Sequence, residues 1–178
     1  MLIPRQPVPA LTVKTLAHGD FDLAVNPPER FTLLTFYRGL HCPICAKYLM
    51  ELERLTPEFE KRGVRTIALS SDTQDRAAAM ADKIHAARLA IGYGLTLQSA
   101  REWGLYISES RGKTSIGIDE PARFSEPGVF LIRPDGTLYY GAVQTMPFAR
   151  PNFSDLVGAI DFAVANDYPA RGEYTGPI

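Results

Sequence analysis

The feature that most constrains the fold is a Cys-x-x-Cys motif placed between two different sequence patterns. Residues 31–37 are almost wholly apolar and rich in β-forming side chains, as in a strand that is buried on both faces. Residues 43–62 carry leucines and a phenylalanine at helical spacing. The only two cysteines, Cys42 and Cys45, are therefore predicted at the N-terminus of a helix that follows a buried strand.

This position favours thiol chemistry, because a helix N-terminus stabilises a thiolate through unpaired N–H groups and the helix dipole. Pro43 is expected in the first helical position, where its missing N–H costs nothing. Cys45 should lie one turn further in and be more buried. We therefore expect Cys42 to be the more exposed cysteine, to have the lower pKa and to attack first, with Cys45 resolving the mixed disulfide.

Redox chemistry competes with three different roles for the motif. A structural disulfide suits a cytosolic protein poorly. A structural zinc site needs four ligands, and the three histidines (His18, His41 and His85) show no finger spacing relative to the two cysteines. The cysteines could also be inert, buried small side chains. Redox chemistry is favoured over all three.

Two basic neighbours could lower the pKa of a thiolate by their positive charge, namely Arg38 and His41. Arg38 could equally pair with Glu51, Glu53 or a C-terminal carboxylate. His41 could equally do no more than fill the position before the motif. No role follows from the sequence for Arg150.

Composition limits the class of protein. A chain of 178 residues is expected to form one domain, residues 1–178. Lys and Arg (19) nearly balance Asp and Glu (20) and are scattered, so no nucleic-acid partner is expected. Prolines interrupt the first ten residues where a signal peptide needs an apolar run, and no stretch of about 18 apolar residues could span a membrane. The expected location is cytoplasmic.

The pattern along the chain predicts an α/β fold with a central mixed sheet, flanking helices and an N-terminal β-hairpin. A middle insertion separates the first half from a second hairpin. The predicted strands are residues 11–13, 21–23, 31–37, 64–70, 126–132 and 137–143, and the predicted helices are residues 43–62, 73–89 and 153–166. The second helix is expected to be capped by residues 71–73. This order matches a thioredoxin-type sheet.

Residues 36–45 read Phe-Tyr-Arg-Gly-Leu-His-Cys-Pro-Ile-Cys. This segment resembles the Phe-Tyr-Arg-Gly-x-x-Cys-Pro-x-Cys signature of the peroxiredoxin-like branch of the alkyl hydroperoxide reductase and thiol-specific antioxidant group. Weaker likenesses to the same group occur at residues 70–72, 103–105 and 127–136. The resemblance implies a thioredoxin fold and thiol-dependent redox activity.

The chain departs from typical peroxiredoxins, which carry Pro-x-x-x-Thr-x-x-Cys and a later arginine that orients the peroxide. Cys45 falls at the peroxidatic position, with Arg38 in place of the proline and Cys42 in place of the threonine. The later arginine falls near Pro127. This alignment implies that Cys45 is oxidised first and Cys42 condenses with it, the reverse of the order expected from exposure.

In thioredoxin-type proteins a cis-proline faces the Cys-x-x-Cys motif. Pro127 matches that position, so the resemblance implies a cis peptide bond between Glu126 and Pro127.

The expected function is that of a dithiol oxidoreductase that reduces hydroperoxides or protein disulfides by cycling Cys42 and Cys45 between dithiol and disulfide. The resemblance implies a thioredoxin- or glutathione-type electron donor and suggests a homodimer. No bound cofactor or metal is needed. Two alternatives stay open: a disulfide reductase without peroxidase activity, and a non-enzymatic redox sensor or binding module.

Overall fold

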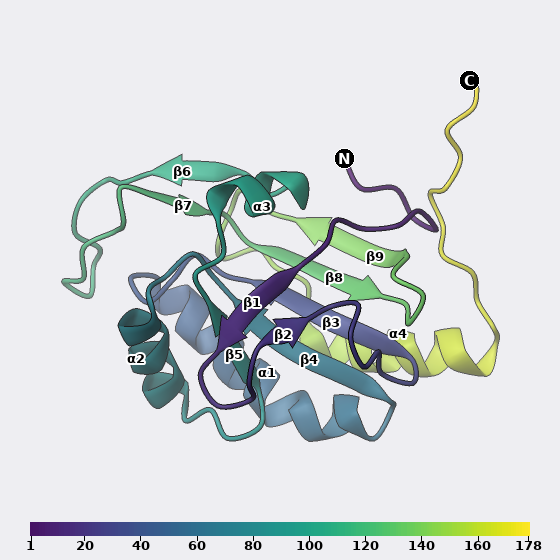
Figure 1. Cartoon of the computed structure of the whole chain (residues 1–178), viewed down its shortest axis with the longest axis horizontal. Coiled ribbons are helices and arrows are strands. Elements are labelled where there is room, and N and C mark those ends of the chain that lie inside the picture. The colour runs from purple at the N-terminus through teal and green to yellow at the C-terminus, as the bar shows by residue number, and fades with distance from the viewer.

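The computed structural model describes residues 1–178 and places seven strands in one mixed sheet (Figure 1). The strands follow the order β2-β1-β5-β4-β3-β8-β9, in which β3, β4 and β5 are parallel and the other pairs are antiparallel. Their bounds are β1 Thr12–Thr15, β2 Phe21–Asp22, β3 Phe31–Phe36, β4 Val64–Leu69, β5 Ala90–Tyr93, β8 Gly128–Ile132 and β9 Leu138–Val143. This arrangement confirms the predicted α/β class, the thioredoxin-like mixed sheet and the N-terminal hairpin, β1–β2.

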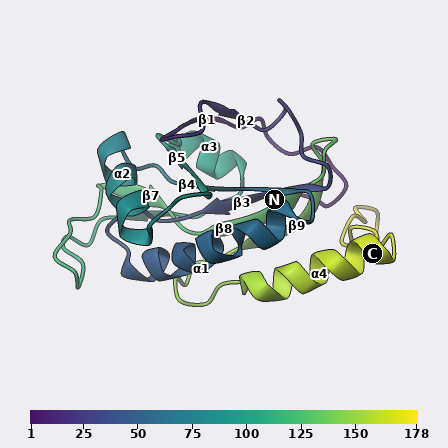
Figure 2. The same cartoon turned by 90° about the horizontal axis from the view of Figure 1, so that it is seen from below.

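Four helices cover the two faces of the sheet: α1 (Pro43–Glu60), α2 (Gln74–Ile84), α3 (Leu97–Glu102) and α4 (Phe153–Ala165). Helices α1, α2 and α4 contribute to the hydrophobic core on one face, where α1 and α4 lie next to each other (Figure 2), and α3 packs on the opposite face. Strand β3 separates the two cores. Leu33 belongs to one core and Leu34 to the other, so both faces of β3 are buried as predicted.

The predicted extent of the second helix is wrong. Helix α2 ends at Ile84, where His85 adopts a left-handed conformation (φ 53°), and not at about Leu89. The alanine-rich run favours a longer helix, but the N–H groups of residues 87–89 donate to the Glu53 carboxylate. Residues 90–93 then form β5, which was not predicted and which pairs with β4 and β1. Gly92 allows this close approach, because a Cβ atom there would lie 3.0 Å from Val13 Cγ2 and 3.1 Å from Leu69 Cβ.

The middle insertion forms a separate two-stranded ribbon, β6 (Ile107–Glu109) and β7 (Arg123–Ser125), joined by a long loop. We call residues 107–125 the arm. In Figure 1 the arm extends beyond the end of the sheet, on the left. The arm leads directly into β8, a central strand of the sheet.

The predicted cis bond before Pro127 is absent, since the chain contains no cis peptide. The dipeptide continues the extended chain from β7 into β8. The Glu126 N–H donates to the Tyr106 carbonyl at 2.7 Å, and the Pro127 carbonyl accepts from the Gln144 N–H at 3.0 Å. The chain is therefore extended and hydrogen-bonded on both sides of the Glu126–Pro127 bond, and it forms no tight turn there of the kind in which a cis bond usually occurs. None of the helices combines the length and apolar character that crossing a bilayer requires.

Candidate active site

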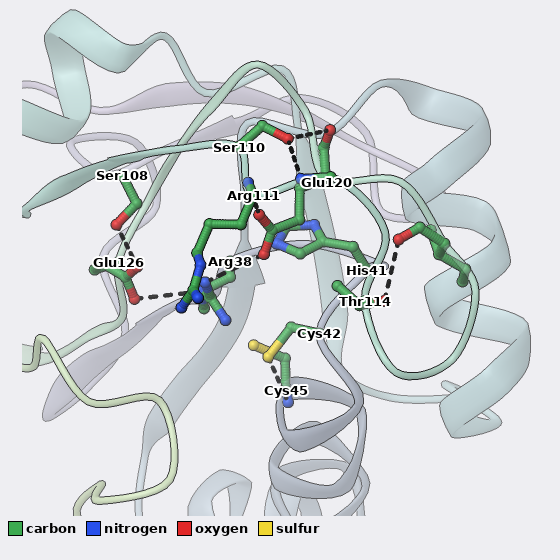
Figure 3. A network of polar contacts seen from close by, with 12 residues as sticks. Arg38, His41, Cys42, Cys45, Ser108, Ser110, Arg111, Thr114, Glu120 and Glu126 are labelled. Atoms are coloured by element: carbon green, nitrogen blue, oxygen red, sulfur yellow. Dashed lines mark hydrogen bonds and ion pairs between the residues drawn. The ribbon is translucent and has the colours of Figure 1, made fainter.

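The two thiols lie together at the first turn of α1. Cys42 is the N-cap residue, with extended backbone (φ −98°, ψ 104°), and its sulfur accepts a hydrogen bond from the Cys45 N–H at 3.3 Å. Pro43 follows as the first helical residue, as predicted. Both cysteines are free thiols, and Figure 3 shows their side chains next to each other at the helix end.

The pKa of Cys42 is lowered to about 6. The largest cause is hydrogen bonding from the Cys45 thiol. The Cys45 N–H and the charges of Arg150 and Arg38 lower the pKa further, against the opposing effect of burial. The direction predicted for the pKa of Cys42 agrees with this result, but Cys42 is only 2% exposed, so the predicted exposure of its sulfur is wrong. The two thiols differ because hydrogen bonds from Cys45 lower the pKa of Cys42, whereas burial raises that of Cys45.

Cys45 has the opposite properties. Burial raises its pKa well above the ordinary value, and donating its hydrogen to Cys42 raises it further. Arg150 partly offsets both effects, because its Nη2 donates to Cys45 Sγ at 3.0 Å. At neutral pH the pair therefore consists of a Cys42 thiolate and a Cys45 thiol.

Arg150 comes from the connection between β9 and α4 and is the main site residue that sequence reasoning missed. Its Nε donates to the Pro147 carbonyl, and its guanidinium lies 4.9 Å from the centre of the Tyr48 ring. The Tyr48 hydroxyl in turn donates to the Pro151 carbonyl at 2.5 Å. We call residues 146–151 the Arg150 segment. These contacts hold it against α1.

Arg38 pairs with two carboxylates, neither of which is Glu51 or Glu53. Its Nη2 is 3.5 Å from Glu120 Oε1, and its Nε is 3.3 Å from Glu126 Oε2 (Figure 3). The Nε contact is an ion pair without good hydrogen-bond alignment. Both predicted roles of Arg38 apply, because it forms ion pairs and its charge also lowers the pKa of Cys42.

The two carboxylates are fixed by the arm and the residue that follows it. Ser108 Oγ donates to Glu126 Oε1 at 2.6 Å, and the Arg111 N–H donates to Glu120 Oε2 at 2.7 Å. Both glutamate side chains are less than 10% exposed. The arm and the residue directly after it therefore supply the two buried acidic partners of Arg38, Glu120 and Glu126.

His41 is fully buried against the Phe124 ring, with the two ring centres 4.6 Å apart. Burial lowers its pKa to about 4, with a smaller contribution from the charge of Arg38. Of the two roles considered for His41, the structure supports filling the position before the motif and not the supply of a positive charge, because the imidazole is neutral at physiological pH. Its Nδ1 lies 3.5 Å from Arg76 Nη2, and its Nε2 is buried without a partner.

The loop before Cys42 is held by Asp72, which sequence reasoning treated only as part of a helix cap. Asp72 Oδ2 accepts from the Leu40 N–H at 2.7 Å, and Oδ1 accepts from Arg76 Nε at 2.8 Å. Gly39 has φ +136°, and a Cβ atom there would lie 2.8 Å from Asp72 Oδ2. Within the predicted cap, residues 71–73, the N-cap residue of α2 is Thr73. A glycine is therefore required where the carboxylate binds the loop.

The structure thus brings Arg38, His41, Cys42, Pro43 and Cys45 together. Pro127, with its trans peptide, does not provide the cis-proline of a thioredoxin-type site. No cluster of three or more His, Cys, Asp or Glu side chains is arranged to hold a metal ion.

Comparison with known proteins gives a consistent result. The profile of the AhpC/TSA family matches residues 4–141. A 1-Cys peroxiredoxin of Onchocerca volvulus is 30% identical over 127 residues, which cover 67% of this chain and 54% of that protein. A 1-Cys peroxiredoxin of Dictyostelium discoideum is 31% identical over 159 residues, or 87% of this chain and 58% of that protein. The chain thus spans just over half the length of these relatives.

Solved structures share the fold. The mitochondrial 2-Cys peroxiredoxin of Plasmodium falciparum superposes with a TM-score of 0.74 at 14% identity, covering 99% of this chain and 100% of that one. Peroxiredoxin 6 of Arenicola marina superposes with a TM-score of 0.71 at 20% identity, covering 93% and 76% of the two chains. These likenesses confirm the thioredoxin-like fold predicted from the sequence.

Proposed function

Since the chain belongs to the AhpC/TSA family, we propose that it is a thiol peroxidase that reduces hydroperoxides through Cys42 and Cys45. The observation that supports this most strongly is the hydrogen bond from the Cys45 N–H to Cys42 Sγ at 3.3 Å, which together with the Cys45 thiol lowers the pKa of Cys42 to about 6. A thiolate is the attacking species, and the second thiol is placed to react with whatever forms on the first.

The proposed reaction has two steps. The Cys42 thiolate attacks the terminal oxygen of the peroxide, and the O–O bond breaks. The oxygen becomes bonded to Cys42 as a sulfenic acid, and the other half leaves as an alcohol, or as water, after taking up a proton. The Cys45 sulfur then attacks Cys42, the S–O bond breaks and water leaves, which produces the Cys42–Cys45 disulfide. A thioredoxin- or glutathione-type donor returns the two electrons.

Arg150 and Arg38 support this chemistry in place of the missing peroxiredoxin residues. Both charges favour the Cys42 thiolate. Arg150 also has a buried Nη1 without a partner, which leaves a donor for the negative charge that develops on the peroxide oxygens. Pro43 starts the helix that carries both sulfurs, and neutral His41 packs behind the motif.

A second order of events is favoured by one observation. Arg150 donates to Cys45, which is also the cysteine that the peroxiredoxin alignment places at the peroxidatic position. In this order Cys45 forms the sulfenic acid and Cys42 condenses with it. Both orders end in the same disulfide.

Two broader alternatives remain as proposals of lower rank. A disulfide reductase without peroxidase activity lacks support from Pro127, whose trans peptide removes the thioredoxin-type cis-proline. A non-enzymatic redox sensor or binding module would be oxidised once without turnover. We also propose a single domain over residues 1–178, a cytoplasmic location and a homodimer, the last from the family resemblance.

The test is a titration of the reduced protein with hydrogen peroxide, followed by intact mass and by stopped-flow kinetics. We expect a mass loss of two hydrogens at one equivalent, far faster than a free thiol reacts. Cys45→Ser should accumulate a sulfenic acid on Cys42 at nearly the wild-type rate, whereas Cys42→Ser should react slowly. Fast oxidation of the Cys42→Ser variant would establish that Cys45 reacts with peroxide first. Slow oxidation of the wild type would reject the proposed peroxidase activity.

A further inference from the structure

A groove beside the dithiol is lined by Arg150 and by residues that take no part in the reaction with peroxide. It lies between the first turns of α1 and the connection from residue 147 to residue 154, with a volume of about 820 Å³. That volume is in the range of about 300–1,000 Å³ that small-molecule sites occupy. Arg150 lines this groove and also contacts Cys45 Sγ, so one side chain connects the groove to the sulfur.

The groove combines apolar walls with unpaired positive charge. Arg54 and Glu51 neutralise each other through hydrogen bonds of 2.8 and 2.6 Å. Lys47 forms no ion pair, and Arg150 contacts only Cys45, the Pro147 carbonyl and the Tyr48 ring. The apolar walls include exposed side chains such as Ile44, Met50 and Phe148. A ligand with carboxylates and a short uncharged body complements this surface.

We propose that this groove binds the reductant, a low-molecular-weight thiol that carries carboxylates, and directs it to Cys45 of the disulfide. The proposal deepens the proposed function and rests on it for the origin of the disulfide. Protein thiols are the competing class of donor. The groove favours the small thiol because its unpaired charges, Lys47 and Arg150, lie within a small-molecule volume.

The chemistry of exchange is consistent with attack at Cys45. The reductant thiolate bonds to Cys45 Sγ, the Cys42–Cys45 bond breaks, and Cys42 leaves as a thiolate. Exchange is faster when the leaving thiol has a low pKa, and Cys42 is the cysteine whose thiolate is stabilised. A second reductant thiolate then attacks the sulfur of the first, which releases Cys45 and a reductant disulfide. Two thiols are oxidised for each protein disulfide reduced.

Arg150 must move for this attack, because Cys45 is fully buried. Disulfide formation removes the hydrogen and the charge that make the pair of sulfurs a polar partner for the guanidinium. Arg150 is then free to bind a carboxylate of the incoming thiol, with which it makes a stronger, charge-assisted contact. Arg150 therefore acts as a positioning residue in this step.

The experiment starts from disulfide made with diamide, so that its outcome does not depend on reactivity with peroxide. Glutathione, which is anionic, and cysteamine, which is cationic, are compared as reductants at equal thiolate concentration. We expect glutathione to be at least tenfold faster. Lys47→Glu should lower the rate of disulfide reduction by glutathione about fivefold and raise the rate of reduction by cysteamine. Lys83→Glu, an unpaired lysine on α2, is the matched control and should change neither rate.

The site of attack is read by rapid quenching with N-ethylmaleimide and peptide mass mapping. Glutathione should be found on Cys45 and the maleimide on Cys42. Equal rates for the two thiols, no effect of Lys47→Glu, or glutathione on Cys42 would overturn the proposal. Reduction by thioredoxin alone would also overturn it and leave the peroxidase intact. A protein that fails to form the disulfide with peroxide but passes this test would reject only the proposed function.

Discussion

Arg38 and Arg150 both act on the pair of sulfurs but lie in different surroundings. Arg38 pairs with two buried glutamates, one in the arm and one directly after it, and its guanidinium lies 4.7 Å from the centre of the Phe124 ring. Arg150 has no carboxylate partner, and one of its nitrogens has no partner at all. One arginine is therefore committed to holding the arm, whereas the other is available to thiolate and ligand.

The largest expected effect is on stability. Arg38→Met leaves Glu120 and Glu126 buried without a counter-charge, and losing one member of a buried ion pair costs about 3–5 kcal/mol. We expect about 3 kcal/mol, because Arg38 retains some exposure. Urea denaturation measures the loss. The double variant Arg38→Met/Glu126→Gln should recover part of the lost stability. An unchanged urea midpoint in the single variant would contradict the conclusion that Arg38 holds the arm in place.

Gly39→Ala tests whether the loop that carries Arg38 depends on Asp72. Backbone strain at a positive φ costs about 1–3 kcal/mol. The added Cβ also displaces a carboxylate that accepts from Leu40 N–H. We expect a loss of about 2 kcal/mol in thermal or urea denaturation, together with slower oxidation of Cys42. Gly94→Ala is a suitable control, because it has positive φ but no atom within 4 Å of the added Cβ.

Arg150→Met, unlike Arg38→Met, should change the rate of oxidation more than the stability of the protein. Its contacts lie in a surface connection, so we expect less than about 1 kcal/mol of lost stability. Oxidation of Cys42 should slow about tenfold, because losing the guanidinium raises the pKa of Cys42 and removes a donor for the peroxide. Thiolate absorbance against pH and stopped-flow kinetics measure the two parts. Arg150→Lys should recover the pKa more than the rate, since it restores charge without the planar fork.

The smallest effect concerns His41. The oxidation rate should be half-maximal near pH 6 and fall about tenfold per pH unit below it, because protonation of Cys42 removes the nucleophile. His41→Gln should leave this midpoint unchanged, since the pKa of His41 is lowered to about 4 and the ring is neutral in that range. A shifted midpoint would mean that His41 carries charge next to the thiolate.

Much of the fold could be predicted because its signals are local. The apolar run of β3, the helical spacing in α1 and the turn at residues 134–136 each determine their own element. Strand β5 could not be predicted, because residues 90–93 are short and follow an alanine-rich run, and only pairing with β4 and β1 makes them a strand. The trans bond at Pro127 likewise follows from pairing on both sides of the dipeptide.

The site was predictable in its sulfurs but not in their surroundings. Cys42, Pro43 and Cys45 follow from a contiguous motif. The low exposure of Cys42 and the neutral state of His41 depend on tertiary packing, which local sequence does not report. Arg150 lies 105 residues from Cys45, and no spacing rule connects them.

That separation has a consequence for the protein during its synthesis. The ribosome releases both cysteines well before it adds Arg150, and the pairing of β3 with β8 also waits for residues 128–132. The hydrogen bonds from Cys45 to Cys42 need only the first turn of α1, whereas the charge of Arg150 can act only after residue 150 has been added and packed against that turn. The part of the low pKa of Cys42 that depends on Arg150 therefore appears late in synthesis.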